Sequence, residues 1–178
     1  MNSWWGELVR FWFGLEPEQW WKPDPKLDER IREDFEPLWN EKRQLPADQF
    51  LDQPLQALAA VILFDQLPRN MFRGHAEQFA TDHLALAIAK GAIARDFDEQ
   101  LEPMERAFLY MPFQHSESIA DQQRSVQLFT RLGDAEMLRY ARLHHDVIER
   151  FGRFPHRNAM LGRQPRADEI AAGDLVPW

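Results

Sequence analysis

The sequence predicts an all-α protein, and three observations support this fold class. Apolar residues recur at the helical period along almost the whole chain, and no segment shows a convincing alternation of period two. Helix start and stop signals punctuate the chain at short intervals. Because short turns between helices make neighbours antiparallel, we expect seven to eight antiparallel helices, arranged as a bundle or as a short stack of helical hairpins.

The first two expected helices are marked by their capping residues. Ser3 can cap a first helix that ends at Gly14, because a serine oxygen accepts from free amides and glycine suits a helix end. Asp24 followed by Pro25 is typical of a second helix start. Pro37 is expected to kink or end this helix. Its apolar face carries Leu27, Ile31, Phe35 and Leu38.

A nearly all-apolar segment follows and is expected to form the centre of the core. Pro54 opens this helix, PLQALAAVILFDQL. Pro68 is expected to stop it, because the residue before a proline avoids the α region. A fourth helix is expected from about residue 75 to residue 90, with Gly91 as its stop.

The remaining helices carry the same kinds of signals. Prolines at positions 103 and 112 bound a fifth helix, which contains ERAFLYM. Ser118 and Asp134 suit the starts of a sixth and a seventh helix, which end at Gly133 and Gly152. The segment DEIAA is expected to form a last short helix.

Length and composition limit the class of protein. With 178 residues, 44% of them apolar, we expect a single all-helical domain over residues 1–178 with a sizeable core. The sequence has no cysteine, which excludes disulfides, zinc–thiolate sites and thiol nucleophiles. Its net charge of −8 argues against general nucleic-acid binding, because that binding is driven by neutralising phosphates.

The N-terminal segment, MNSWWGELVRFWFG, is not typical of a signal peptide, because it lacks a basic first region. No run of about 18 apolar residues is present anywhere in the chain. We therefore expect a cytoplasmic protein with no membrane partner. The five tryptophans among the first 21 residues are interpreted as core residues rather than as a membrane-interface belt.

Two short basic segments stand out in this acidic chain. FGRFPHRNAMLGR at 151–163 and LPRNMFRGH at 67–75 contain no acidic residue, and both combine a proline, an Arg-Asn pair and a glycine. One interpretation is helix termination, because arginine suits the negative end of the helix dipole and asparagine tolerates turn conformations. The other interpretation is that their arginines form a binding site.

The second interpretation draws on Asp65, which lies in the last turn of its expected helix, where the dipole disfavours a carboxylate. A residue placed against its local preference usually has a strong tertiary partner. We therefore expect a structural ion pair between Asp65 and an arginine of these segments, with Arg157 or Arg153 favoured. If the arginines exceed the local carboxylates, the surplus charge would bind a phosphate or a carboxylate.

His115, Ser116 and Glu117 form a compact polar group directly before an expected helix start, a position where anions bind readily. A histidine near a glutamate can carry out general acid–base chemistry at neutral pH. Alternatively, Ser116 or Ser118 caps the helix and Glu117 supports its dipole. No G-x-S-x-G elbow or P-loop glycine run is present in the sequence.

Four strings occur in order along the chain: FWFG at 11–14, FDQLPRNMFRG at 64–74, HSE at 115–117 and FGRFPHRNAMLGR at 151–163. Through them the chain resembles, over nearly its whole length, the mainly bacterial family catalogued as domain of unknown function 924. The resemblance implies a tetratricopeptide-like stack of helical hairpins and implies no reaction. The recurrent polar positions of the family correspond here to Asp65, Arg69, Asn70, His115, Glu117, Arg153, His156, Arg157 and Asn158.

Two hypotheses of function follow. In the first, a polar cleft binds a small anionic ligand and, in the stronger form of the hypothesis, transforms it. The ligand-binding residues would be Arg69, Asn70, Arg153, Arg157 and Asn158, and the catalytic candidates His115, Glu117 and His156. In the second, the chain is a tetratricopeptide-like interaction module without catalytic activity, whose arginines hold a peptide carboxylate.

We expect no metal site and no cofactor. His144 falls on the apolar stripe of its helix and is interpreted as a core residue. His145 and Glu149 form an i, i+4 pair on another face, and this pair needs further ligands from elsewhere to hold a metal ion.

Overall fold

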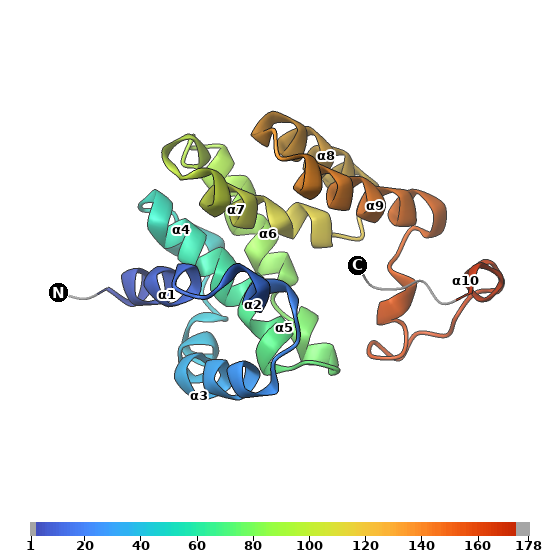
Figure 1. Cartoon of the computed structure of the whole chain (residues 1–178), viewed down its shortest axis with the longest axis horizontal. Coiled ribbons are helices and arrows are strands. Elements are labelled where there is room, and N and C mark those ends of the chain that lie inside the picture. Colours follow the sequence, from blue (N-terminus) through green and yellow to red (C-terminus); the bar gives the residue numbers. More distant parts are fainter. Residues whose placement is uncertain (1–2, 174–178) are drawn as a thin grey trace. The chain divides into compact units, whose positions relative to one another are not determined.

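The computed structural model describes residues 3–173, and over this range all of the regular structure is helical (Figure 1). The all-α prediction is therefore confirmed, whereas tetratricopeptide-like stacking and the single domain stay predictions. Backbone contacts divide the chain into two compact units, residues 1–112 and residues 113–178. Each unit is described by itself.

The first unit is built around one buried helix, α4. This helix contacts α1 and α6, while α5 contacts α3. Every residue of α4 from Gln56 to Val61 is buried, which confirms that the apolar segment after Pro54 forms the core. The helices are α1 (Trp4–Phe13), α2 (Pro17–Trp21), α3 (Pro25–Lys42), α4 (Pro54–Val61), α5 (Leu67–Met71), α6 (Asp82–Ile93) and α7 (Pro103–His115), which extends past the unit boundary. Short 3₁₀ turns cover Ala47–Phe50, Ala76–Phe79 and Asp98–Gln100.

The first two helix starts are confirmed, and of the two outcomes expected at Pro37, a kink or an end, the end is wrong. Ser3 accepts a hydrogen bond from an amide of α1, and Asp24 accepts from two amides of α3. The helix α3 does not end at Pro37 but continues to Lys42. Pro37 lies on the exposed side, where water can bond to the carbonyl that loses its amide partner. The short helix α2 was not expected from the sequence.

Pro68 does not stop its helix, contrary to the expectation. The helical run continues from α4 through a π-helical turn at Ile62–Gln66 and into α5. A proline at position 68 has no amide to donate to the Phe64 carbonyl. The Thr81 hydroxyl donates to that carbonyl instead, at 2.6 Å. A partner 17 residues away thus satisfies the acceptor that the proline leaves, and local sequence gives no sign of it.

The expected stops at Gly91 and Pro112 are also wrong. Helix α6 begins later than expected and runs through Gly91 to Ile93. A Cβ atom at position 91 would lie 2.5 Å from Leu51 Cδ1, so the glycine makes room for a packed neighbour instead of ending the helix. Helix α7 continues through Pro112, which places His115 in the last turn of a helix.

The N-terminal tryptophans differ in burial. The expected core role is confirmed for Trp12, which is 1% exposed and packs its ring edge-to-face against Phe108 at 5.6 Å. Trp21 is 50% exposed, although its ring stacks on Phe108 at 5.8 Å. Phe108 itself is fully buried, so this aromatic group anchors the N-terminal segment within the first unit.

The second unit contains a helical hairpin, in which α8 and α9 lie side by side (Figure 1). Gly133 ends α8 with a φ of 83°, a left-handed conformation that favours glycine. Asp134 then caps α9, and Gly152 ends it, so these expected boundaries are confirmed. The bounds are α8 (Ile119–Leu132), α9 (Ala135–Phe151), a 3₁₀ turn at Pro155–Arg157, and α10 (Ala167–Ala172).

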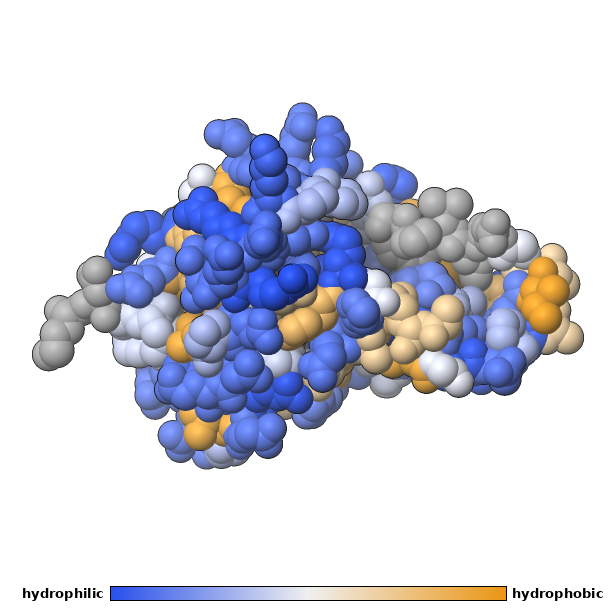
Figure 2. Space-filling view, turned by 90° about the horizontal axis from the view of Figure 1, so that it is seen from below, coloured by the Kyte–Doolittle hydropathy of each residue, from blue (hydrophilic) through white to orange (hydrophobic). Residues whose placement is uncertain are grey.

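The exposed surface carries few large apolar side chains. Hydrophilic residues predominate on the face in Figure 2, and hydrophobic residues form small separate groups there. Scattered apolar residues of this kind are normal on a protein surface. Within residues 3–173, no helix combines the length and the apolar character that crossing a membrane requires. The exposed large apolar residues are Trp21, Leu45, Leu55, Met104, Ile119, Leu143, Leu161 and Ile170.

Candidate functional site

The two basic segments belong to different compact units. LPRNMFRGH lies in the first unit, at α5 and the turn after it. FGRFPHRNAMLGR lies in the second unit, together with His115 and Glu117. The site residues expected from the sequence therefore form two groups.

In the first unit, Arg69 is held by carboxylates. Its two terminal nitrogens donate to the two oxygens of Asp82, at 2.8 and 2.9 Å. Its Nη1 also lies 3.4 Å from Asp65 Oδ1 and donates to the Asp65 backbone carbonyl. Burial opposes the charge of the guanidinium, but attraction by Asp82 and then by Asp65 raises the pKa of Arg69 overall. A two-pronged pair of this kind fixes the side chain in place.

Asn70 and Arg73 converge on a single carboxylate, that of Asp28 in α3. Asn70 Nδ2 donates to Asp28 Oδ1 at 2.8 Å. Arg73 donates to both oxygens, at 2.7 and 3.0 Å. The hydrogen bonds from Arg73 to Asp28 raise the pKa of Arg73. These contacts tie α5 and its following turn to α3.

The expected position of Asp65, in the last turn of its helix, is wrong. Asp65 is fully buried, but it lies in the π-helical turn within a continuing helical run, not in the last turn of a helix. It pairs with Arg69, which belongs to the basic segment LPRNMFRGH that follows Asp65 closely in the sequence. Arg153, one of the two favoured partners, is held by Glu169 in the second unit. The pairing of Asp65 with Arg157 stays a prediction.

In the second unit, Glu117 ties the HSE string to the chain after α9. Its carboxylate accepts two hydrogen bonds from Arg163, at 2.7 and 3.0 Å, and one from the Phe154 amide at 2.7 Å. Burial would raise the pKa of Glu117, but the hydrogen bonds from Arg163 and Phe154 lower it overall. Glu117 is therefore a carboxylate at neutral pH, with both oxygens already accepting.

Glu169 of α10 is a second buried carboxylate, 4% exposed. Arg153 donates to both of its oxygens, at 2.5 and 2.8 Å. Asn158 Nδ2 and the Arg166 amide donate to Oε2, at 2.9 and 2.8 Å. The hydrogen bonds from Arg153, followed by those from Arg166 and Asn158, lower the pKa of Glu169 to about 2. This network fixes α10 to the segment that carries His156 and Arg157.

Glu169→Gln is expected to lower the melting temperature at pH 7 and to have little effect near pH 2. A carboxylate whose folded-state pKa is lowered contributes stability above its ordinary pKa of about 4.3, and loses it as the pH falls towards the folded-state pKa. Thermal unfolding between pH 7 and pH 2 measures this. Asp168→Asn, at an exposed neighbouring position, is the matched control and is expected to leave the profile unchanged. If Glu169→Gln and Asp168→Asn showed the same dependence of melting temperature on pH, this would contradict the role of Glu169.

Three histidines and an arginine gather near Phe154, and we call His115, His144, Phe154, His156 and Arg157 the histidine cluster. The ring of His144 lies 6.2 Å from that of His115 and 5.7 Å from that of Phe154. The His156 ring lies 5.6 Å from Phe154, and the Arg157 guanidinium lies over Phe154 at 4.5 Å. Arg157 also donates to the His115 carbonyl at 3.0 Å. The cluster draws on the end of α7, the middle of α9 and the turn after α9.

His144 is buried at the centre of this cluster, as expected of a residue on the apolar stripe of α9. Its Nδ1 lies 2.8 Å from the Tyr140 carbonyl, which can only accept, so the proton of the neutral ring is assigned to Nδ1. Burial, followed by the positive field of His115, lowers the pKa of His144 to about 2, and Arg157 and His156 act in the same direction. His144 is therefore neutral at physiological pH.

Ser116 makes several hydrogen bonds in the turn before α8. Ser116 Oγ donates to Asp121 at 2.8 Å and accepts from the Ser118 amide at 3.2 Å. Gln122 Nε2 donates to the Ser116 carbonyl at 2.7 Å. Ser118 is the N-cap residue of α8, and its side chain makes no capping hydrogen bond, so the anion site at this helix start stays a prediction.

Several partners in these networks were not assigned a role from the sequence, among them Asp82, Arg163 and Glu169. Glu169 had a local signal, because it stands three residues after Arg166 at the start of α10, the spacing of a capping box. Asp82 is in the first turn of α6. Because this helix was expected to start near residue 75, the sequence did not indicate that Asp82 lies at a helix start. Arg163 had no signal beyond its place in the basic segment.

Comparisons with known proteins agree on the family. The model of a family of bacterial proteins of unknown function, DUF924, matches residues 8–172. Among solved structures, a protein of unknown function from Agrobacterium tumefaciens is 38% identical, with a TM-score of 0.87, and the match covers 94% of this chain and 95% of that one. A search of curated proteins finds no match. This similarity supports the fold. The function has to be inferred from the chemistry of the site.

Proposed function

We propose that this chain, which belongs to the bacterial family of unknown function DUF924, binds a small anionic ligand at the histidine cluster of the second unit. The ligand would carry a phosphate or a carboxylate. The observation that supports this most is the gathering of His115, His156 and Arg157 around one buried histidine. Guanidinium and imidazole groups are the usual partners of such anions in proteins.

The charge of the cluster supports the same proposal. Burial lowers the pKa of His144 most, and the positive charges of His115, Arg157 and His156 lower it further, so a positive field is present at this point. A field that opposes a proton on His144 favours an anion in the same place. Imidazole gains charge as the pH falls towards 6, so ligand affinity should rise in that direction.

The proposed site contains fewer ligand-binding residues than the sequence indicated. Arg153 and Asn158 bond to Glu169, and Arg69 and Asn70 bond to carboxylates of the first unit, so we assign these four residues to structure rather than to ligand binding. Glu117 is assigned to positioning, because its oxygens accept from Arg163 and Phe154. His115 and His156 remain the candidates for proton transfer, if the ligand is also transformed.

A thermal-shift panel of inorganic phosphate, nucleotides and small carboxylates, measured at pH 6 and pH 8, tests the proposal. A ligand at 100 times its Kd stabilises the folded state by about 2.7 kcal/mol. We expect at least one anion to raise the melting temperature, more at pH 6 than at pH 8. His156→Gln and Arg157→Gln should reduce the shift, and His83→Gln, at an exposed position of α6, should not.

Two results would overturn the proposal. One is the absence of a shift with every anion of the panel. The other is a shift that survives unchanged in both His156→Gln and Arg157→Gln, since the anion would then bind elsewhere. Circular dichroism of each variant separates a lost site from a lost fold.

A further inference from the structure

We infer that His145, Asp146 and Glu149 of α9 bind a divalent transition-metal ion of the zinc type. Ligand atoms of these three side chains lie within 4.8 Å of one another. The sequence led us to expect no metal, because the His145–Glu149 pair needed a further ligand. The structure supplies that ligand from the adjacent residue, Asp146.

The spacing of His145 and Asp146 suits a tetrahedral ion better than a direct hydrogen bond. His145 Nδ1 lies 3.4 Å from Asp146 Oδ1. Nitrogen–oxygen hydrogen bonds usually span about 2.7–3.2 Å. Two zinc ligands at bond lengths of about 2.0–2.2 Å and a tetrahedral angle lie about 3.3–3.6 Å apart. An ion between these two atoms therefore requires almost no movement of either side chain.

Glu149 completes a set of three. It follows His145 by one helical turn, so the two side chains lie on the same face of α9. Glu149 is exposed, and its side chain is free to rotate towards the ion. Two carboxylates neutralise a divalent ion, and the imidazole favours zinc, cobalt or nickel over calcium and magnesium, which prefer oxygen ligands alone.

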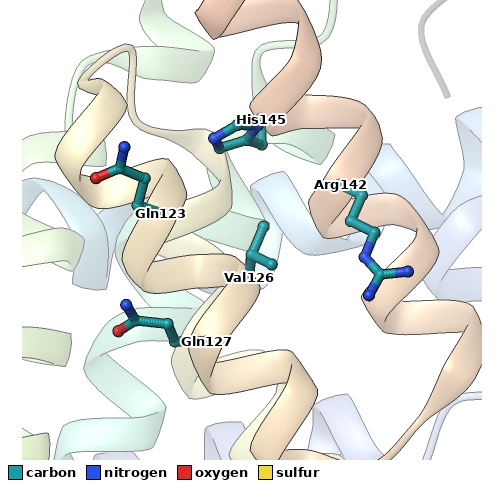
Figure 3. A pocket seen from close by; sticks show the side chains of 5 residues that line it. All are labelled: Gln123, Val126, Gln127, Arg142 and His145. Atoms are coloured by element: carbon teal, nitrogen blue, oxygen red, sulfur yellow. The ribbon is translucent and has the colours of Figure 1, made fainter.

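A surface hollow beside His145 provides room for a fourth ligand, such as water. The hollow has a volume of about 310 Å³ and lies between α8 and α9. In Figure 3 the His145 ring extends from α9 towards α8, at the end of the hollow where Gln123 lies. Arg142 also lines the hollow, and its exposed side chain extends away from His145. The lining residues are Gln123, Val126, Gln127, Arg142 and His145.

Zinc titration of the full chain by calorimetry, after treatment with a chelator, tests this inference. We expect one zinc ion per chain. Loss of even an outer-shell partner of a metal weakens binding by roughly 10–100-fold. His145→Gln and Glu149→Gln, which each remove a ligand, should therefore weaken zinc binding at least about tenfold. Glu136→Gln, an exposed acid in the first turn of the same helix, is the matched control.

The histidine cluster is the competing zinc site, and a His115→Gln variant distinguishes it. Zinc binding that survives in both His145→Gln and Glu149→Gln, or that is lost only in His115→Gln, would overturn the inference. So would the absence of any zinc binding to the wild-type chain. This inference does not depend on anion binding, because each experiment uses its own ligand and its own variants.

Discussion

Arg69→Ala is expected to lower the free energy of unfolding by about 3–5 kcal/mol, because removing one member of a buried ion pair takes away part of the compensation for the other charge. Asp65 is fully buried, and the side chain of Asp82 is 19% exposed. Asp82 would lose two hydrogen bonds from the guanidinium, and Asp65 would lose its ion pair with Arg69 at 3.4 Å. Denaturant unfolding at pH 7 measures the difference through the shift of the midpoint.

Arg73→Ala is the control for this prediction. Arg73 also donates to both oxygens of a carboxylate, but its side chain is 44% exposed. Pairs with an exposed member contribute about 0–1 kcal/mol, and Asp28, although only 12% exposed, keeps the hydrogen bond from Asn70, so this variant should lose about 1 kcal/mol or less. The burial of the arginine, and not the number of its hydrogen bonds, then accounts for the difference between the two variants.

A neutral or stabilising Arg69→Ala would contradict this assignment. It would mean that the arginine is held at a cost to stability, as residues of functional sites often are. Arg69 would then be assigned to ligand binding, as the sequence first indicated. The same measurement therefore decides between a structural and a functional role.

The stability of the wild-type protein is expected to fall by about 2 kcal/mol between pH 8 and pH 5 through His144 alone. Burial and the field of His115 lower the pKa of His144 to about 2 in the folded state. In the unfolded chain an ordinary histidine takes up a proton below about pH 6.5. Stability is therefore complete above pH 6.5, and it is lost by up to about 1.4 kcal/mol per pH unit as the pH falls.

His144→Gln should flatten this part of the pH profile, because glutamine does not titrate. His145→Gln changes the next residue of α9, outside the buried stripe, and should keep the wild-type slope. Denaturant midpoints measured in steps from pH 8 to pH 5 give both slopes. If His144→Gln keeps the full slope, the acid sensitivity arises from another group and the electrostatic description of the cluster fails.

The sequence predicted well wherever one local signal decided the outcome. Ser3, Asp24 and Asp134 begin helices, and Gly133 and Gly152 end them, because a capping residue acts on the amides and carbonyls next to it. It failed at the prolines and the glycine that lie inside helical runs. Pro68 and Gly91 lie inside helical runs because Thr81 supplies a donor for the first and Leu51 needs the space at the second.

The candidate site, too, could be predicted from the sequence only in part. The basic segments were visible in the sequence, because an absence of acids over 13 residues needs no structure to be seen. The partners of their arginines were not visible. Asp28 is 45 residues before Arg73, and Glu117 is 46 residues before Arg163. No helical period or capping rule connects residues so far apart.

By itself, the sequence determined that the chain is helical, where several helices begin and end, and which segments concentrate positive charge. All of these depend on interactions within a few residues. Only the tertiary structure decided which carboxylates hold Arg69 and Arg153, and which side chains gather around Phe154. The physical reason is that burial and charge pairing depend on distances through space, and folding sets those distances by packing the whole chain.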